Sequence, residues 1–497
     1  MTFASRGRAA FVLTLVLAAI FAAYLAVLSD GMPAAATDWA MYVMHTHNIL
    51  TGRPYADTGY VFQPEAAFMG PQSYPSGYPL MLAPVYAVFG FHIRAFKVLS
   101  DLALVLSLWP LYVLCRRVLP LPYAICIIVA TGFGYEYIGI QNTVNSDAPY
   151  QLLSFLGLVL MQWIYDRGKD AGRQWRWGAV AGIVLSVAYL TRPIGLALIL
   201  AVILSTVFRQ RRLSFFLAAL VSVFVLAALL NNTLFHRDSA YNDQFIFSAA
   251  AIVQKAVTYL GYLSHAFANP WSNRLRYLLW SVSVPLVLVG IPINIRRRGN
   301  MLLEIYTLIL VGVLCIYILP NTRYLAPILP LYLSYAALGW EAVLERIPNA
   351  YRTASQTVAA AALLLPAAIN LAYLPSIEQD TFVARPAFEQ LCKEIQKEVG
   401  PHEYILFWNP RVLALYTNRA ASAYPLADAP EVERYLNRIR PNYVVLDKHW
   451  DDDHHYLAPV VESQPQQYVA VFENERYKLE RISDAPDRRS AQPAPIP

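Results

Sequence analysis

Long apolar runs alternate with short polar turns along the first 375 residues of the chain. A helix needs roughly 20 apolar residues to cross the hydrocarbon core of a bilayer. Runs near that length lie at residues 9–28, 95–115, 120–134, 148–165, 177–191, 193–208, 213–231, 277–295, 301–319, 325–345 and 356–374. This pattern predicts a polytopic α-helical membrane protein with about eleven transmembrane helices.

The composition favours a membrane protein over a large soluble domain. Of the 497 residues, 57% are hydrophobic and only 14% are charged, whereas a soluble domain carries about 25% charged residues. The four cysteines show neither a zinc-binding spacing nor a disulfide framework. We expect membrane lipids as partners and no nucleic acid.

The basic residues between the apolar runs indicate an orientation. They lie before the first run and at 116–117, 166–176, 208–212, 296–298 and 346–352. These are alternate loops, as the positive-inside rule requires of cytoplasmic loops. We therefore expect a multi-pass protein of the cell (inner) membrane with a cytoplasmic N-terminus and an extracytoplasmic C-terminal region. Cleavage of the first run as a signal peptide after "PAAAT" stays open, although this run exceeds the usual apolar core of about 7–15 residues.

The chain divides into a membrane part, a polar region and a tail. Residues 1–375 form the membrane part, with long outer loops at 29–93 and 232–276. In the region 376–484, strand patterns at 404–408, 442–447, 467–472 and 477–482 alternate with helical patterns at 387–399 and 430–439. This alternation predicts a small extracytoplasmic α/β domain. The tail 485–497 is expected to be disordered. The run "DDDHH" at 451–455 is either a metal site or, more commonly for such runs, a solvated loop.

The first outer loop is too long for a mere connector. After Asp38, the apolar residues Trp39, Tyr42, Val43, Ile49 and Leu50 share one side of a helix. This spacing predicts a helix lying on the membrane surface with Asp38 at or near its N-cap. A short apolar helix is expected near 78–91. His45 and His47 diverge by about 200° on a helix and are interpreted as surface residues.

Charged residues gather at the outer ends of the predicted spans. Charges at the edge of the hydrocarbon are costly unless they are paired or used. Any single arginine there could snorkel to lipid headgroups. For the whole set we expect convergence on one outer cavity. The candidate residues are Asp38, Asp147, Arg192, Arg274, Arg276 and Arg323, with Tyr78 and Tyr324 beside them.

Five stretches in this order resemble the GT-C class of membrane glycosyltransferases, in particular the protein O-mannosyltransferases and the aminoarabinose transferases acting on lipid A. They are "TDWAMYVMHTHNILTGRPY", "SYPSGYPLMLAPVYAVFG", "NSDAPYQLL", "YLTRPIGLAL" and "RYLAPILPLYL". The resemblance covers about residues 9–345. Many members carry Asp-Glu where this chain has Asp38-Trp39, so no cofactor is assigned and dependence on a divalent metal stays open.

The resemblance implies a polyprenyl-phosphate-linked sugar donor and an acceptor hydroxyl on a lipid, a polysaccharide or a protein. Asp38 is then the general base of an inverting displacement, and partial desolvation is expected to raise its pKa. Arg192 and Arg323 are candidates to hold the lipid phosphate, and Arg274 or Arg276 could replace either one.

Two further residue types have expected roles in the same site. Asp147 would orient sugar hydroxyls or hold an arginine in place. Tyr324 and Tyr78 would line the sugar pocket by stacking. No residue is assigned to a metal.

Two other classes of protein compete with this interpretation. A transporter or flippase of lipid-linked or small polar substrates would show charges near the middle of the membrane and inverted repeats. Neither pattern is evident in the sequence. A scaffold displaying the α/β domain would leave the outer charges of several separate loops without a purpose.

Overall fold

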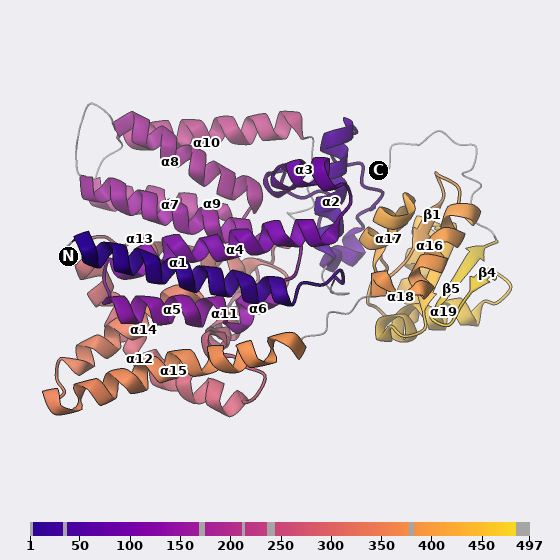
Figure 1. Cartoon of the computed structure of the whole chain (residues 1–497). Helices are drawn as coiled ribbons and strands as arrows, with labels where there is room; N and C mark the ends of the chain where they lie inside the picture. Colours follow the sequence, from indigo (N-terminus) through magenta and orange to yellow (C-terminus); the bar gives the residue numbers. More distant parts are fainter. Residues whose placement is uncertain are drawn as a thin grey trace.

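The computed structural model describes residues 3–32, 37–167, 174–210, 214–235, 244–376 and 382–483. A bundle of long helices carries a small sheet domain at one end, and the helices of the first outer loop lie between the two parts (Figure 1). The end that carries the sheet domain is called the outer end below. The predicted disordered tail 485–497 lies outside the described residues.

The predicted polytopic helical fold is confirmed, and each predicted run overlaps a helix. Among the described residues, five helices, α1, α4, α10, α12 and α15, are long and apolar enough to cross a membrane on their own, while shorter apolar helices include α5, α9 and α13. The number eleven therefore stays a prediction. The helices are α1 (Phe3–Ala26), α4 (Ile93–Arg116), α5 (Leu121–Gly132), α7 (Asp147–Arg167), α8 (Gln174–Thr191), α9 (Gly195–Gln210), α10 (Phe215–Leu234), α12 (Asn273–Arg298), α13 (Leu302–Ile316), α14 (Leu329–Leu344) and α15 (Asn349–Tyr373).

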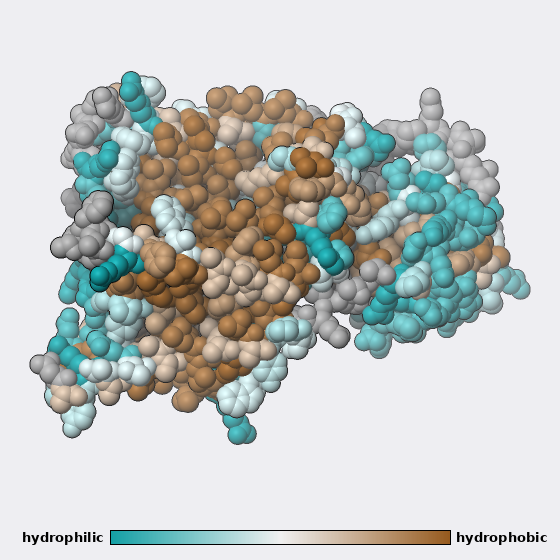
Figure 2. All heavy atoms as spheres, viewed as in Figure 1, coloured by the Kyte–Doolittle hydropathy of each residue, from teal (hydrophilic) through white to brown (hydrophobic). Residues whose placement is uncertain are grey.

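Apolar side chains cover the middle of the bundle, and polar side chains gather at both of its ends (Figure 2). At the end far from the sheet domain, Arg117 pairs with Asp166, and Arg209 donates to the Gly299 carbonyl at 3.1 Å. The basic loops thus meet at one end of the bundle, as alternate loops on one side of a membrane must.

Glycines allow some of these helices to cross closely. A Cβ added at Gly290 of α12 would lie 1.9 Å from the Tyr335 carbonyl oxygen, and one at Gly339 of α14 would lie 2.0 Å from that of Leu286. Helices in a bilayer associate largely through such close packing, because lipid tails are as apolar as their own side chains.

The C-terminal domain contains one five-stranded sheet in the order β2-β1-β3-β5-β4. Strand β1 (Tyr404–Leu406) is parallel to β2 (Ala420–Ser422) and β3 (Tyr443–Asp447), while β5 (Tyr477–Ile482) is antiparallel to β3 and to β4 (Tyr468–Glu473). Its main helices are α16 (Pro386–Glu398), α17 (Pro410–Thr417), α18 (Ala429–Ile439) and α19 (Ala458–Ser463). The four predicted strands and two predicted helices are present. Strand β2 and helices α17 and α19 were not predicted, because each is only three to eight residues long.

The outer loops contain short helices of their own. In the first loop these are α2 (Asp38–Thr51), η1 (Pro64–Met69) and α3 (Gly77–Phe89), so the short helix expected near 78–91 is present as α3. The loop between α5 and α7 forms α6 (Tyr135–Ile140). The second long loop forms α11 (Ala249–Tyr262) and η4 (Leu263–Phe267), and η5 (Thr322–Leu325) precedes α14.

Helix α2 does not lie on a surface, so that prediction is wrong. Every residue from Trp39 to Thr46 is buried, because α3 packs on one side of the helix and α17 of the C-terminal domain on another. His45 is accordingly fully buried and is not a surface residue. Its Nδ1 donates to the Tyr55 carbonyl at 2.8 Å, and its Nε2 accepts the Tyr74 backbone N–H at 3.1 Å.

The first outer loop is joined to the sheet by backbone hydrogen bonds. Val61 donates to the Ala421 carbonyl, and Ala421 donates to the Gly59 carbonyl, both at 2.9 Å. Tyr60 thereby extends the sheet beyond β2 as a parallel bridge. This pairing fixes the C-terminal domain against the outer end of the bundle.

Candidate active site

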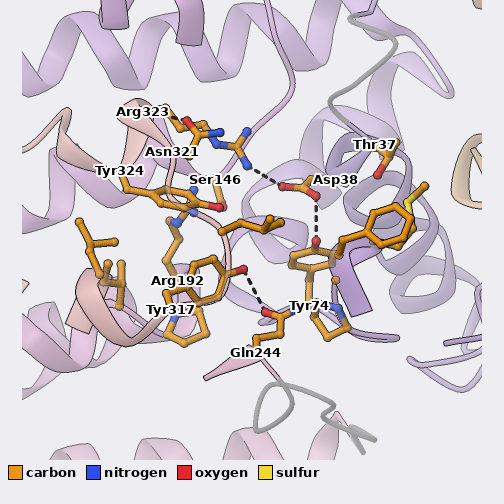
Figure 3. A pocket seen from close by; sticks show the side chains of 18 of the residues that line it. Thr37, Asp38, Tyr74, Ser146, Arg192, Gln244, Tyr317, Asn321, Arg323 and Tyr324 are labelled. Atoms are coloured by element: carbon orange, nitrogen blue, oxygen red, sulfur yellow. Dashed lines mark hydrogen bonds and ion pairs between the residues drawn. The ribbon is translucent and has the colours of Figure 1, made fainter. Parts of the chain in front are cut away.

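A cavity of about 740 Å³ lies between the outer end of the bundle and the C-terminal domain. Four of the predicted site residues line it: Asp38, Arg192, Arg323 and Tyr324. Figure 3 shows Asp38 bonded to Arg323 and to Tyr74, with Tyr324 nearby. Residues more than 280 positions apart in sequence therefore meet here, with Arg323 Nη2 3.1 Å from Asp38 Oδ2.

Asp38 is held by three partners. Its Oδ1 accepts hydrogen bonds from the Tyr74 hydroxyl at 2.8 Å and from Arg411 Nη1 at 3.2 Å, and its Oδ2 pairs with Arg323. Asp38 is the first residue of α2, next to Thr37 at the cap position, and so lies near the N-cap as predicted. A carboxylate in the first turn of a helix is favoured by the partial positive charge there.

The pKa of Asp38 is lowered, contrary to the prediction. Burial by itself would raise it, but the Arg323 and Arg411 guanidinium groups and the hydrogen bond from Tyr74 outweigh that effect. Asp38 is therefore ionised at neutral pH. With both arginines in contact it is also a weaker base than an isolated carboxylate.

Asp147 lies behind the two arginines that line the cavity. It begins α7 and forms an ion pair with Arg192, while its Oδ2 is 3.9 Å from Arg323 Nε. It lines a small adjoining pocket and not the main cavity. Of the two roles expected for Asp147, this position fits holding an arginine and does not fit contact with sugar hydroxyls.

The two arginines share an aromatic support. The Arg192 and Arg323 guanidinium carbons each lie 5.4 Å from the centre of the Tyr324 ring. Cations within about 6 Å of a ring face are attracted to its π electrons. Tyr324 and Asp147 together hold two positive charges side by side at the cavity wall.

Besides Asp147, three predicted site residues lie outside the cavity. Tyr78 is fully buried, and its hydroxyl bonds to Ser100 Oγ at 2.6 Å. Arg276 donates to Ser264 Oγ at 2.8 Å, and Arg274 is exposed on the first turn of α12. The prediction that these residues contact the substrate is therefore not supported by their positions. Within "SYPSGY" it is Tyr74, four residues before Tyr78, that points toward Asp38.

Arg411 is the most important residue that the sequence did not reveal. It is fully buried, donates to the Pro71 carbonyl at 3.1 Å and lies 4.7 Å from the centre of the Tyr60 ring. The available signal was a lone charge in the apolar stretch "FWNPRVLALY", directly after a strand. Loops at the carboxyl ends of parallel strands commonly carry ligand-binding groups.

The charges of the site suit an anionic group better than a metal ion. The carboxylates of Asp38 and Asp147 are each paired with arginine, and such cationic surroundings disfavour a second cation. Within the described part of the chain, no three His, Cys, Asp or Glu side chains are grouped so as to hold a metal. The run "DDDHH" is not a simple solvated loop: Asp453 is buried and accepts hydrogen bonds from the Tyr424 hydroxyl and, at 2.6 Å, from the Asp447 backbone.

The membrane side of the cavity is apolar and partly open to the surroundings of the bundle. It is lined by Leu196 and Leu200 of α9 and by Val313 of α13, with Leu319 just beyond. Leu196 and Leu319 are each 42% exposed. An apolar groove thus leads from the outside of the bundle to the two arginines.

The fold is that of solved GT-C glycosyltransferases. The crystal structure of ArnT from Cupriavidus metallidurans bound to undecaprenyl phosphate matches with a TM-score of 0.57 and 12% identity, over 94% of this chain and 97% of that chain. AglB from Archaeoglobus fulgidus, in complex with an inhibitory peptide and a dolichol-phosphate, matches with a TM-score of 0.55 and 13% identity, over 92% of this chain and 72% of that chain. The arabinofuranosyltransferase AftD from Mycobacteria matches with a TM-score of 0.52 and 13% identity, over 95% of this chain and 40% of that chain.

The chain belongs to the DUF2079 family of predicted membrane proteins, whose model matches residues 29–474. None of the curated proteins matches the chain by sequence. At 12–13% identity the solved structures establish the shared fold, and the activity of this chain has to be argued from its own residues.

Proposed function

We propose that this protein transfers a sugar from a polyprenyl-phosphate-linked donor to an acceptor hydroxyl at the outer face of the cytoplasmic membrane. The observation that carries the proposal is one cavity in which Asp38 faces Arg323 and Arg192 at the inner end of an apolar groove. A carboxylate, two fixed cations and a path for a lipid tail are the groups that this reaction needs.

The donor fits the cavity in two parts. Its isoprenoid tail lies along the apolar groove beside Leu196 and Leu200, where burial of apolar surface stabilises it by about 25 cal/mol per Å². Its phosphate lies at Arg192 and Arg323, since guanidinium groups bind phosphate oxygens through paired, charge-assisted hydrogen bonds. The neighbours ArnT and AglB were solved with undecaprenyl phosphate and a dolichol-phosphate.

The reaction is a single displacement at the anomeric carbon. The acceptor hydroxyl oxygen forms a bond to this carbon, and the bond from the carbon to the phosphate oxygen breaks with its electron pair going to the phosphate. Arg192 and Arg323 stabilise the growing negative charge. The hydroxyl proton passes to Asp38, and attack opposite the leaving phosphate inverts the anomeric centre. General-base assistance of this kind typically contributes about 10²–10⁴-fold.

Donor binding also adjusts the basicity of Asp38. Arg323 donates to Asp38, and a bound phosphate would compete for the same guanidinium. Asp38 would then keep its hydrogen bonds from Arg411 and Tyr74. It would lose its contact with Arg323, one of the groups that lower its pKa. The carboxylate thus becomes a better base when the donor is in place.

The experiment compares two Asp→Asn variants in cells that lack the chromosomal gene. Asp38→Asn removes the proposed base, while Asp57→Asn makes the same change at an exposed position of the same outer loop. Mass spectrometry of envelope glycans should show a missing sugar in the deletion strain and in Asp38→Asn cells, restored by wild type and by Asp57→Asn. Full restoration by Asp38→Asn would remove Asp38 from the mechanism. Native mass spectrometry of the purified variants with undecaprenyl phosphate tests donor binding separately.

A further inference from the structure

The C-terminal domain supplies one wall of the cavity, and each part of that wall follows the carboxyl end of a parallel strand. Trp408 comes two residues after β1, Tyr424 two residues after β2, and Trp450 three residues after β3, with Asp452 close behind. In open α/β sheets, ligands bind outside the carboxyl ends of the strands. The C-terminal domain therefore turns its ligand-binding edge toward the cavity that holds Asp38.

The two tryptophans mark the topological switch point of this sheet. Strand β1 lies between β2 and β3 in the sheet. The chain passes from β1 to β2 on one side and then crosses to β3 on the other side, so the direction of the connections reverses between β1 and β3. The crevice between β1 and β3 is where such sheets bind ligands. Here Trp408 and Trp450 occupy it as a stacked pair, with ring centres 4.0 Å apart and planes 11° apart.

Buried polar groups hold this aromatic wall in place. Trp408 Nε1 donates to Asp447 Oδ2 at 3.2 Å, and Asp447 also pairs with Arg476 at 2.8 Å. The Tyr424 hydroxyl donates to Asp453. Because the polar atoms of Trp408 and Tyr424 are already engaged, these side chains offer mainly carbon surface to the cavity.

The charges are divided between the two sides of the cavity. Among the described residues, the cations that line it are Arg192 and Arg323, both on the membrane side. The C-terminal domain contributes one charged lining residue, Asp452. A carboxylate beside aromatic rings accepts hydroxyl hydrogens and repels anions. The C–H face of a sugar ring stacks on an aromatic ring, so this wall fits a neutral saccharide and disfavours a phosphorylated or acidic one.

A polypeptide acceptor fits this wall less well. Extended peptides commonly bind by adding a strand to an exposed sheet edge. The β2 edge beside the cavity is already occupied by Tyr60 of the first outer loop.

We infer that the acceptor is a neutral saccharide and that Trp408, Trp450, Tyr424 and Asp452 form its binding subsite. This inference rests on the proposed function and names its acceptor class. The saccharide stacks on the Trp450 side of the pair and directs one hydroxyl toward Asp38, while the donor phosphate stays with the arginines.

Saturation-transfer NMR on the full chain in lipid nanodiscs tests the subsite. The probes are maltotriose and mannotriose as neutral saccharides and an acetylated Gly-Ser-Thr-Ser-Gly amide as a peptide. Wild-type protein should contact the ring protons of at least one trisaccharide and not the peptide. Trp450→Ala should weaken that binding about tenfold, the size expected for the loss of one aromatic partner. Trp271→Ala is the matched control, because Trp271 is 68% exposed and outside the cavity.

A second variant guards against misfolding of the first. Asp452→Asn removes a charge at nearly constant volume and should weaken trisaccharide binding several-fold. The inference is overturned if neither trisaccharide binds to wild-type protein, if binding is unchanged in both variants, or if the peptide binds in their place. Undecaprenyl phosphate binding is measured on the same samples. Loss of this binding in wild-type protein counts against the proposed function, whereas the trisaccharide data alone decide the inference about the acceptor.

Discussion

Replacing Arg411 by methionine tests the link between the C-terminal domain and Asp38. Arg411 reaches from α17 to Asp38 Oδ1 at 3.2 Å and also holds the Tyr74 hydroxyl at 3.0 Å. Methionine keeps much of the side-chain volume and removes the charge. The variant therefore leaves Arg323 as the cation in contact with Asp38.

The size of the effect follows from the burial of the pair. Breaking a fully buried ion pair by removing one partner costs about 3–5 kcal/mol. Asp38 is 25% exposed and keeps Arg323, so we expect the lower end, about 3 kcal/mol in the free energy of unfolding. The lowered pKa of Asp38 stabilises the fold above its unfolded pKa of about 3.9, and this contribution is lost as the pH falls through the folded pKa. Without Arg411 the folded pKa rises, and that loss begins at a higher pH.

The assay is the rate of sugar transfer by protein in nanodiscs between about pH 3 and 8, a range that begins below the ordinary carboxylate pKa of about 3.9. Transfer needs ionised Asp38, so the rate falls on the acid side of the profile. Removing one arginine neighbour should move that fall to a higher pH. Arg438→Met is the matched control, since Arg438 also joins the C-terminal domain to the first outer loop through Glu65, at 2.8 Å, but is 52% exposed. It should cost no more than about 1 kcal/mol and leave the pH profile unchanged.

Two results would refute this reasoning. If Arg411→Met is destabilised but the fall in rate at acid pH does not move, Arg411 supports the fold and does not lower the pKa of Asp38. If Arg438→Met shifts this fall equally, the effect comes from domain docking in general.

Three further predictions test other parts of the molecule. Asp38→Asn should lower turnover about 10²–10⁴-fold with no loss of undecaprenyl phosphate binding, and normal turnover would exclude it as the base. Arg192→Ala should raise the KM for the donor about tenfold or more, because a charge-assisted hydrogen bond contributes about 1.5–3 kcal/mol, and should leave the KM for the acceptor unchanged. An unchanged donor KM would mean that Arg192 has a structural role only. Gly339→Ala should lower the Tm in detergent, because its Cβ would lie 2.0 Å from a backbone oxygen of α12. Gly312→Ala should leave the Tm unchanged, because its Cβ would have no neighbour within 4 Å. Equal Tm values would contradict the close crossing of α12 and α14.

The sequence revealed the residues whose position in a membrane is itself a signal. Asp38, Arg192 and Arg323 stand at the ends of apolar runs, where a charge is costly, and the structure brings all three to one cavity. The alternation of apolar runs and polar turns predicted the helices for the same reason, since a bilayer imposes their length.

What the sequence could not reveal depends on contacts between distant segments. The pKa of Asp38 was predicted to rise because burial was visible and Arg411, 373 positions away, was not. Tyr78 was chosen over Tyr74 because both are tyrosines in one short stretch, and only the path of the chain decides which faces the cavity. Helix α2 was placed on a surface because α17, which covers it, belongs to another domain.

The central claim is that the phosphate of a lipid-linked donor binds between Arg192 and Arg323, across from Asp38. Electron cryomicroscopy of the full chain in nanodiscs with undecaprenyl phosphate tests it most directly. We predict phosphate density within hydrogen-bonding distance of both guanidinium groups, with the isoprenoid chain leaving between α9 and α13. Density for the phosphate at any other place, with Arg323 still bonded to Asp38, would contradict the account.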